Sequence, residues 1–467
     1  MFRKKAIFIG ILLAGCLLIN GIGHAATINA SSCSQSDVLS AINSSNTGDT
    51  VVIPSGTCSW SASVAVNKNI IVQGAGSGVG GTKLQRSSGS FFNSAGNPRI
   101  TGIHFEASGT AENYIQIKGT GGWRINNCRI ENTTTMSRVG VYVRFNSTDG
   151  QPVGLIDNNI FENCRVYVQS GLITAYNTLM DESSLLGTGN TVYIEDNVMD
   201  RTGYASVGGS GNVIDSQYGG SFVFRFNTVT NAHLEVHAPG GGNTPARGGR
   251  YWEIYGNSMS HPSSAWDRAI FIRGGTGVIF NNEITDAGFE RNNIDLDIHN
   301  QRNDTCNGSS SADGNLGSKD NAGWPCRDQI GRATDSFLWQ SGGSVPSQKS
   351  EPAYFWGNAG FDSAQIYSGD GSYIVQGRDY YEDDDIHMKS GVWADRPETC
   401  DEGDGYWATD LGEWNSNNAG NDGALYICND SNRFVLYYTP YTYPHPLRQT
   451  SGGLEQLQPP KNLQIIN

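Results

Sequence analysis

Ionisable and aromatic residues recur at the ends of short aliphatic stretches in the middle of the chain. Alternation places most of the aliphatic side chains inside a strand and their neighbours outside. One outward column then holds Lys118, Arg144, Gln169, Asp215, His237, Arg273, and Asp297 or His299. A second outward column holds Gln116, Tyr142, Tyr167, Val213, Glu235, Phe271 and Asp295. A solvated face would more often carry Ser, Thr, Asn and Lys, so we interpret these columns as a functional groove.

These residue types suit β-elimination on an acidic sugar chain. That reaction needs a base to remove the proton beside a carboxylate, and a cation to neutralise the carboxylate. His237 is the candidate base, with Asp215 or Glu235 to orient it. The predicted catalytic residues are His237, Asp215, Arg273 and Glu235. The predicted substrate-binding residues are Arg144, Arg250, Tyr142, Tyr167, Phe271 and His299.

Three alternatives stay open for the same face. Calcium is a possible neutralising ion with Asp295 and Asp297 as ligands, but calcium takes six to eight oxygen atoms, and the sequence does not supply that set. A glycoside hydrolase needs two carboxyl groups about 5 Å or about 6.5–9.5 Å apart, which Asp215 and Glu235 could provide. A non-catalytic adhesin or glycan-binding module would use the groove without turnover.

A short repeat determines the predicted architecture. The pattern is an apolar residue, two residues, Asn, one residue and another apolar residue. Full copies carry Asn159, Asn197, Asn227, Asn257 and Asn282, partial copies carry Asn177 and Asn358, and two earlier copies have Ile103 and Cys128 at the Asn position. Uneven spacing around a fixed motif indicates a solenoid with variable loops. Asn at a bend can take the left-handed conformation and can hydrogen-bond to the Asn of the next coil.

This repeat resembles the right-handed parallel β-helix of the pectate-lyase-like superfamily, and residues 36–60 add to the resemblance. They predict a short helix from Asp37, with Ser36 as N-cap and Val38, Leu39 and Ile42 on its apolar face. The resemblance implies that this helix plugs the open N-terminal end of the coil, where strand edges would otherwise be exposed. It indicates an all-β fold but says little about function, because one fold hosts many chemistries.

The chain has 467 residues, a length that alone suggests about three domains. The repeat instead predicts a signal peptide at residues 1–26, one β-helix at 27–380, a C-terminal cap over the last coil at 381–450, and a linker-like tail at 451–467. We expect a monomer that acts on a polysaccharide. The formal net charge of −14 argues against nucleic acid and anionic membranes as partners.

The N-terminus predicts export from a bacterial cell. Arg3, Lys4 and Lys5 precede a largely apolar run that ends in small residues, as in a signal peptide. The sequence Leu-Ala-Gly-Cys ending at Cys16 also resembles a lipobox, so a lipid anchor at the cell surface is the alternative to secretion. No other stretch is long and apolar enough to predict a membrane span.

Nine cysteines leave eight once Cys16 is set aside. An even number in an oxidising compartment predicts disulfides. The natural pairs are Cys33–Cys58, Cys306–Cys326 and Cys400–Cys428, while Cys128 and Cys164 either pair or remain buried thiols. The spacing fits no zinc motif.

Overall fold

The computed structural model describes residues 25–144, 152–170, 185–203, 211–238, 248–261, 268–286, 291–297, 313–315, 324–326, 329–333, 349–366, 374–383 and 386–449. Residues 1–24 of the predicted signal peptide, which include the possible anchor Cys16, and the predicted tail from residue 451 lie outside the described residues. The predicted Cys306–Cys326 pair also involves a residue outside them.

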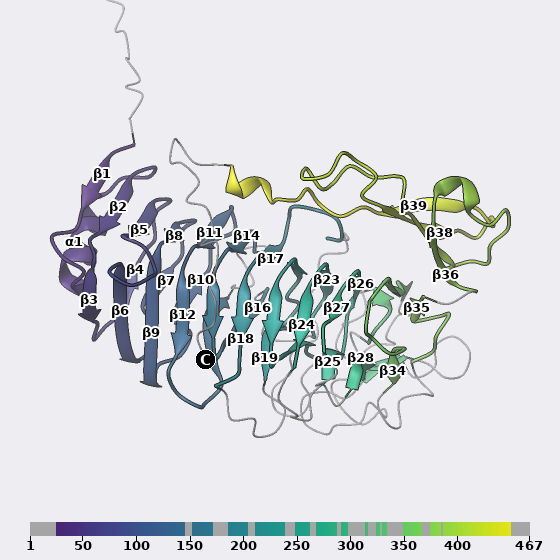
Figure 1. The fold of residues 1–467 in the computed structure, drawn as a ribbon, viewed down its shortest axis with the longest axis horizontal. Helices are drawn as coiled ribbons and strands as arrows, with labels where there is room; N and C mark the ends of the chain where they lie inside the picture. Colours follow the sequence, from purple (N-terminus) through teal and green to yellow (C-terminus); the bar gives the residue numbers. More distant parts are fainter. Residues whose placement is uncertain are drawn as a thin grey trace, which may run out of the picture.

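The chain winds as a right-handed parallel β-helix, so the predicted fold is confirmed (Figure 1). Each coil contributes a strand to each of three parallel sheets in turn. Sheet A contains β1 (Thr27–Asn29), β2 (Thr50–Ile53), β5 (Ile71–Gly74), β8 (Arg99–Thr101), β11 (Trp123–Asn126), β14 (Gly154–Asp157), β17 (Val192–Glu195), β20 (Phe222–Arg225), β23 (Tyr251–Tyr255), β26 (Thr276–Phe280), β33 (Ala353–Trp356) and β35 (Tyr380–Glu382). The apolar face of each coil is buried only because neighbouring coils continue it.

Sheets B and C complete each turn. Sheet B contains β3 (Gly56–Ser59), β6 (Thr82–Ser88), β9 (Ile103–Thr110), β12 (Arg129–Asn132), β15 (Ile160–Glu162), β18 (Val198–Asp200), β21 (Thr228–Thr230), β24 (Ser258–Ser260) and β27 (Glu283–Ile284). Sheet C contains β4 (Val64–Ala65), β7 (Phe92–Ser94), β10 (Ile115–Ile117), β13 (Arg138–Val143), β16 (Cys164–Gln169), β19 (Asn212–Gln217), β22 (His233–Val236), β25 (Arg268–Ile272), β28 (Arg291–Leu296) and β34 (Gln365–Ile366). Two short antiparallel pairs, β29 (Asp313–Asn315) with β30 (Trp324–Cys326) and β31 (Arg332–Ala333) with β32 (Lys349–Ser350), lie between β28 and β33 in the chain.

An asparagine ladder runs along the bend between sheets A and B. Its members are Asn159, Asn197, Asn227, Asn257, Asn282 and Asn358, and each of the first five donates from Nδ2 to Oδ1 of the next at 2.8–3.1 Å. Each Nδ2 also donates to a carbonyl of the preceding coil, as Asn197 does to Ile156 at 3.0 Å. These amides satisfy buried backbone groups that the bend leaves out of the sheets.

Two details of the predicted repeat are corrected. Asn159 bonds directly to Asn197, so no coil intervenes at Asn177, which itself lies outside the described residues. The residue before each ladder asparagine, not the asparagine itself, takes the left-handed conformation, as at Asn158 (φ 54°) and Phe226 (φ 56°). The ladder side chain therefore points into the bend, while its neighbour makes the turn.

The N-terminal helix α1 (Gln35–Ser44) plugs the first coil, as predicted. Its buried residues are Val38, Ala41 and Ile42, which belong to the same apolar core as the strands. The N-cap is Ser34 rather than Ser36, because the Ser34 hydroxyl accepts from the Asp37 amide. The helix thus begins two residues earlier than the sequence suggested.

The C-terminal region lies along sheet A and does more than cover the last coil (Figure 1). It forms the small sheet β36 (Met388–Gly391), β37 (Gly405–Ala408), β38 (Ala424–Cys428) and β39 (Phe434–Tyr438), with 3-10 turns at η2 (Trp393–Asp395) and η3 (Pro446–Arg448). Tyr438 donates to the buried carboxylate of Glu253 at 2.5 Å, and Arg225 donates to the carbonyl of Tyr441 at 2.7 Å. Farther back, Arg124 reaches the carbonyl of Leu447 at 3.4 Å. The segment therefore contacts strands from β35 back to β11.

Two of the disulfides predicted from the sequence are present among the described residues. Cys33–Cys58 and Cys400–Cys428 form disulfides. Cys128 and Cys164 are buried free thiols, and burial raises the pKa of each to about 12. No helix among the described residues has the length and apolar character to span a membrane.

Candidate functional site

The predicted site lies on sheet C, but one strand departs from strict alternation. Tyr167 pairs with Asp215 and Gln169 with Gln217. Asp215 therefore belongs to the second outward column, on the coil that follows Tyr142 and Tyr167. Gln217 takes the position in the first column that was predicted for Asp215.

The shift has a clear cause in β19. Val213, predicted to face outward, is fully buried, and so is its neighbour Ile214. Because two consecutive residues face the core, the inward and outward alternation of the following residues shifts by one position. The register is irregular between Asn212 and Ile214. The irregularity places Asp215 in the same column as Glu235, one coil away.

His237 and Asp215 form a pair at the carboxyl end of β22. The His237 amide donates to the carbonyl of Ser216 at 2.9 Å, which fixes its backbone. Its Nδ1 hydrogen-bonds to the carboxylate of Asp215, whose side chain is 1% exposed while that of His237 is 13% exposed. An ionised carboxylate can only accept, so Nδ1 carries a proton, and in the neutral form of the imidazole the lone pair is on Nε2.

Glu235 is the centre of a second set of contacts. Arg273 donates to Oε1, and Asn212 donates to Oε2 at 2.7 Å. His233 Nε2 lies 3.6 Å from Oε2, and His237 Nε2 lies 3.9 Å from Oε1. Burial alone would raise the pKa of Glu235, but Arg273, His237 and His233 hold that pKa well below its ordinary value. Glu235 is therefore ionised at neutral pH.

Several residues of this network were missed by the sequence analysis. Arg165 Nη1 donates to Asn212 Oδ1 at 2.9 Å and lies 3.5 Å from Asp215 Oδ2. It therefore links Asp215 to Asn212, the residue that donates to Glu235. Arg165 and His233 stand two residues before Tyr167 and Glu235, so alternation extended upstream would have placed them on the same face. Asn212 had no such signal because the irregularity of β19 precedes Asp215.

The predicted aromatic residues do share a column, but they are half-buried and their rings contact other side chains. The rings of Tyr142 and Tyr167 stack at 5.5 Å, and each hydroxyl donates at 2.7 Å to a glutamine of the next coil. Arg268 lies over Phe271 at 3.9 Å from the ring centre. Arg144 is exposed at the end of β13, in the column of Gln169 and His237.

Other predicted site residues are not brought to this cluster. Arg250 is 3% exposed and bonds to Tyr251 at 2.5 Å, with Glu351 at 3.5 Å, so it is not available to a substrate as predicted. His299 lies outside the described residues.

The residues do not fit the possible calcium site. The carboxylate of Asp295 is fully buried and bonds to Arg291 at 2.7 Å and Asn293 at 3.0 Å. Among the described residues, neither Asp295 nor Asp297 belongs to a group of three close metal donors. Donor atoms of Asp215, Glu235 and His237 lie within 4.8 Å of one another, but this set contains one imidazole, and hydrogen-bonding partners from the protein already occupy it. Calcium prefers six to eight oxygens.

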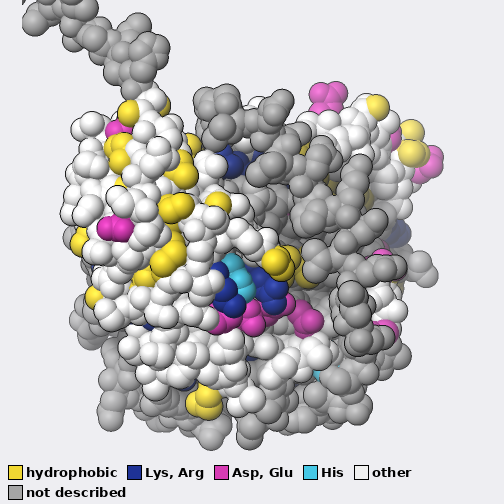
Figure 2. All heavy atoms as spheres, turned by 60° about the vertical axis from the view of Figure 1, so that its left-hand side comes forward, with side chains coloured by type: hydrophobic (Ala, Val, Ile, Leu, Met, Phe, Trp, Pro, Cys, Tyr) yellow, Lys and Arg dark blue, Asp and Glu magenta, His cyan; other side chains and the backbone are white. Residues whose placement is uncertain are grey.

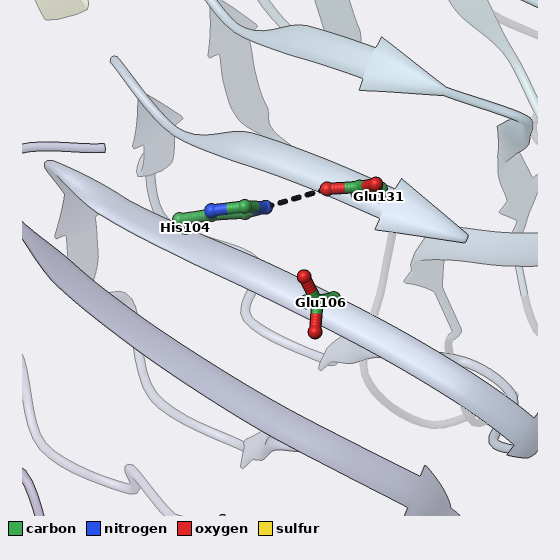
Figure 3. Close-up of side chains that lie close together, drawn as sticks. All are labelled: His104, Glu106 and Glu131. Atoms are coloured by element: carbon green, nitrogen blue, oxygen red, sulfur yellow. Dashed lines mark hydrogen bonds and ion pairs between the residues drawn. The ribbon is translucent and has the colours of Figure 1, made fainter. Parts of the chain in front are cut away.

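A second cluster of the same residue types lies on sheet B and was not predicted. Figure 2 shows a compact group of basic, histidine and acidic side chains on one face of the molecule. On sheet B, His104 pairs in register with Lys83 and Arg129, and Glu106 pairs with Glu131. The ring of His104 points at the Glu131 carboxylate, 2.8 Å away, while Glu106 lies aside on the strand of His104 (Figure 3).

This second cluster is an ion-pair ladder. Each basic side chain bonds to the carboxylate of the next coil: Lys83 to Glu106, His104 to Glu131, and Arg129 to Glu162, the last at 2.7 and 3.0 Å. The hydrogen bond from His104 lowers the pKa of Glu131. Because each carboxylate has its own basic partner, the repetition along the coils accounts for the cluster without a ligand.

Comparisons with known proteins give only distant similarities. No protein-family model matches the chain, and no curated protein matches it in sequence. An alginate lyase from Paenibacillus sp. str. FPU-7 aligns with 18% identity and a TM-score of 0.32, covering 56% of this chain and 97% of the lyase. The catalytic domain of a GH87 α-1,3-glucanase in complex with nigerose aligns with 11% identity and a TM-score of 0.29, covering 76% and 67%. At such TM-scores, neither similarity carries an argument about activity.

Proposed function

We propose that this protein is a polysaccharide-active enzyme, a lyase that cleaves an acidic polysaccharide by β-elimination on sheet C. The observation that supports this is the His237–Asp215 pair beside Arg273. Asp215 holds the proton on Nδ1, which leaves Nε2 of His237 as the base. Arg273 bonds to Glu235, whose Oε1 lies 3.9 Å from that base, and Arg273 would neutralise the carboxylate beside the proton removed.

The elimination follows from these roles. His237 Nε2 takes the proton next to the sugar carboxylate, and the electron pair of that C–H bond forms a carbon–carbon double bond. The glycosidic C–O bond at the neighbouring carbon breaks, and its oxygen leaves with the bonding pair and takes a proton from water. Asp215 stabilises the imidazolium that results. Exposed Arg144 lies in the same column and would bind a more distant acidic sugar.

A hydrolase on the same face is less well supported. Its general acid must be a protonated carboxyl group with a raised pKa. Glu235 has a lowered pKa, and the carboxylate of Asp215 accepts the proton of His237 Nδ1. Neither group is arranged to deliver a proton to a leaving oxygen.

The test is an incubation of the protein with a panel of acidic and neutral polysaccharides. We expect products with ultraviolet absorbance from the new double bond, formed from an acidic polymer and lost in His237→Ala. New reducing ends without that absorbance would show a hydrolase. Binding without any product would show a non-catalytic module. Turnover unchanged in His237→Ala would refute the site.

A further inference from the structure

A separate pocket lies where the C-terminal sheet meets the last coils of sheet A. It has a volume of about 790 Å³. Its walls come from the ends of β26 and β33 on one side and from β36 and β37 on the other. The candidate active site lies on sheet C, so the pocket belongs to a different face of the β-helix. Its size falls in the range of small-molecule sites.

Trp356 forms part of this pocket and carries an unused hydrogen-bond donor. The residue is 1% exposed, and its ring stacks on Phe280 at 4.4 Å and contacts Trp407 at 4.8 Å. Its indole Nε1–H is buried and has no acceptor among the described residues. The stacking holds the ring in place, and none of the described groups that line the pocket accepts from this N–H. Buried N–H groups in native proteins nearly always have an acceptor.

The remaining polar groups of the pocket favour a neutral, hydroxyl-rich ligand. They are Asn281, Asp383, Lys389, Ser390, Asp395 and Thr409. The lining has two carboxylates and one ammonium group, and this excess of negative charge opposes a uronate. Carboxylates, hydroxyls and amides accept or donate hydrogen bonds to sugar hydroxyls, and Asp383 is fixed by the amide of Gly357 at 2.9 Å.

We propose that this pocket binds a neutral saccharide and that Trp356 Nε1–H donates to one of its oxygen atoms. The pocket would thus hold a chain of a different charge class from the substrate of sheet C. This assignment does not rest on the proposed lyase activity, because it uses neither His237 nor Arg273.

Ligand-observed NMR titration of the full chain with cellotriose and maltotriose tests the proposal, with trigalacturonate as the acidic probe. We expect at least one neutral trisaccharide to bind. Trp356→Phe keeps a ring in the stack but removes the N–H, so affinity should fall about threefold to tenfold. Asp395 is exposed and lines the pocket, so Asp395→Ala should also weaken binding. Trp393→Phe is the matched control, since Trp393 lies on the C-terminal segment but does not line the pocket.

Binding that survives in His237→Ala and Trp393→Phe, but weakens in Trp356→Phe and Asp395→Ala, would support the proposal. Absence of binding by both neutral probes would overturn it. Equal weakening in Trp393→Phe, or loss in His237→Ala, would place the binding elsewhere and overturn it as well. If Trp356→Phe melts at a lower temperature, Asp395→Ala alone decides between these outcomes.

Discussion

Sheets B and C each carry a histidine bonded to a carboxylate, yet the two clusters are built differently. On sheet B, His104 contacts Glu131 within a ladder in which every base has its own acid on the next coil. On sheet C, Asp215 and Glu235 converge on His237 from two coils. A repeating ladder needs only regular strands, whereas the convergent cluster depends on the irregular strand β19. The comparison teaches that departure from the repeat, rather than charge, marks the candidate site.

The largest effect should come from removing the convergent histidine. His237→Ala should lower lyase turnover about 10²–10⁴-fold, because general-base catalysis contributes that much. His104→Ala is the matched control and should leave turnover unchanged. Initial rates from the ultraviolet absorbance of the unsaturated product decide the question. Loss of turnover in His104→Ala instead would reverse the assignment of the two sheets.

Asp215→Asn should also reduce turnover, by about 10²-fold or more, since an amide can donate to Nδ1 and move the imidazole proton to Nε2. We expect the effect in kcat rather than KM, because Asp215 is buried and acts through His237. Glu131→Gln changes the corresponding partner of His104 and should leave both constants unaltered. A change in KM alone would mean that Asp215 positions substrate instead.

Removing a carboxylate should lower the free energy of unfolding more on sheet C than on sheet B. Glu235→Gln leaves Arg273 and its neighbours without their buried counter-charge, and loss of a buried partner costs about 3–5 kcal/mol. Glu131→Gln breaks a half-buried ladder contact and should cost less than about 1 kcal/mol. Denaturant unfolding of both variants measures the difference. Equal losses of unfolding free energy would show that the two networks contribute equally to stability.

The smallest effect concerns pH. The pKa of Glu235 is lowered in the folded state, so its stabilising contribution is complete above the ordinary glutamate value of 4.5 and is lost as the pH falls below it. The wild type and Glu235→Gln should therefore approach each other in melting temperature below about pH 4.5. The corresponding gap for Glu131→Gln should be small throughout. A Glu235→Gln gap that widens in acid would contradict the lowered pKa.

The sequence predicted the fold well because the ladder motif is local. Asn197 and Asn227 follow the same short pattern, and the same hydrogen bonds repeat at each coil. The site was predicted less completely. Alternation located His237, Glu235 and Arg273, since β22 and β25 keep a regular outward face.

Alternation failed where tertiary packing overrode it. Asp215 was placed in the wrong column because Val213 and Ile214 are both buried, which no period of two describes. Arg250 carries a charge in a loop-rich stretch, but its neutralising partner Glu351 is about a hundred residues away in sequence. The sheet B ladder was not predicted, because its bases and acids become neighbours only when the coils stack in register.

The direct bonds between Asn282 and Asn358 have an engineering consequence. Seventy-six residues separate the two in sequence, yet they meet at 2.9 Å as closely as ladder neighbours one short coil apart. The solenoid thus accepts a long insertion between two coils without interrupting the asparagine ladder. This junction is a natural graft point. Foreign loops in place of the segment that contains β29 and β30 should change the surface that the protein presents, provided that Ile330, a core residue, and Glu351, the partner of Arg250, are kept.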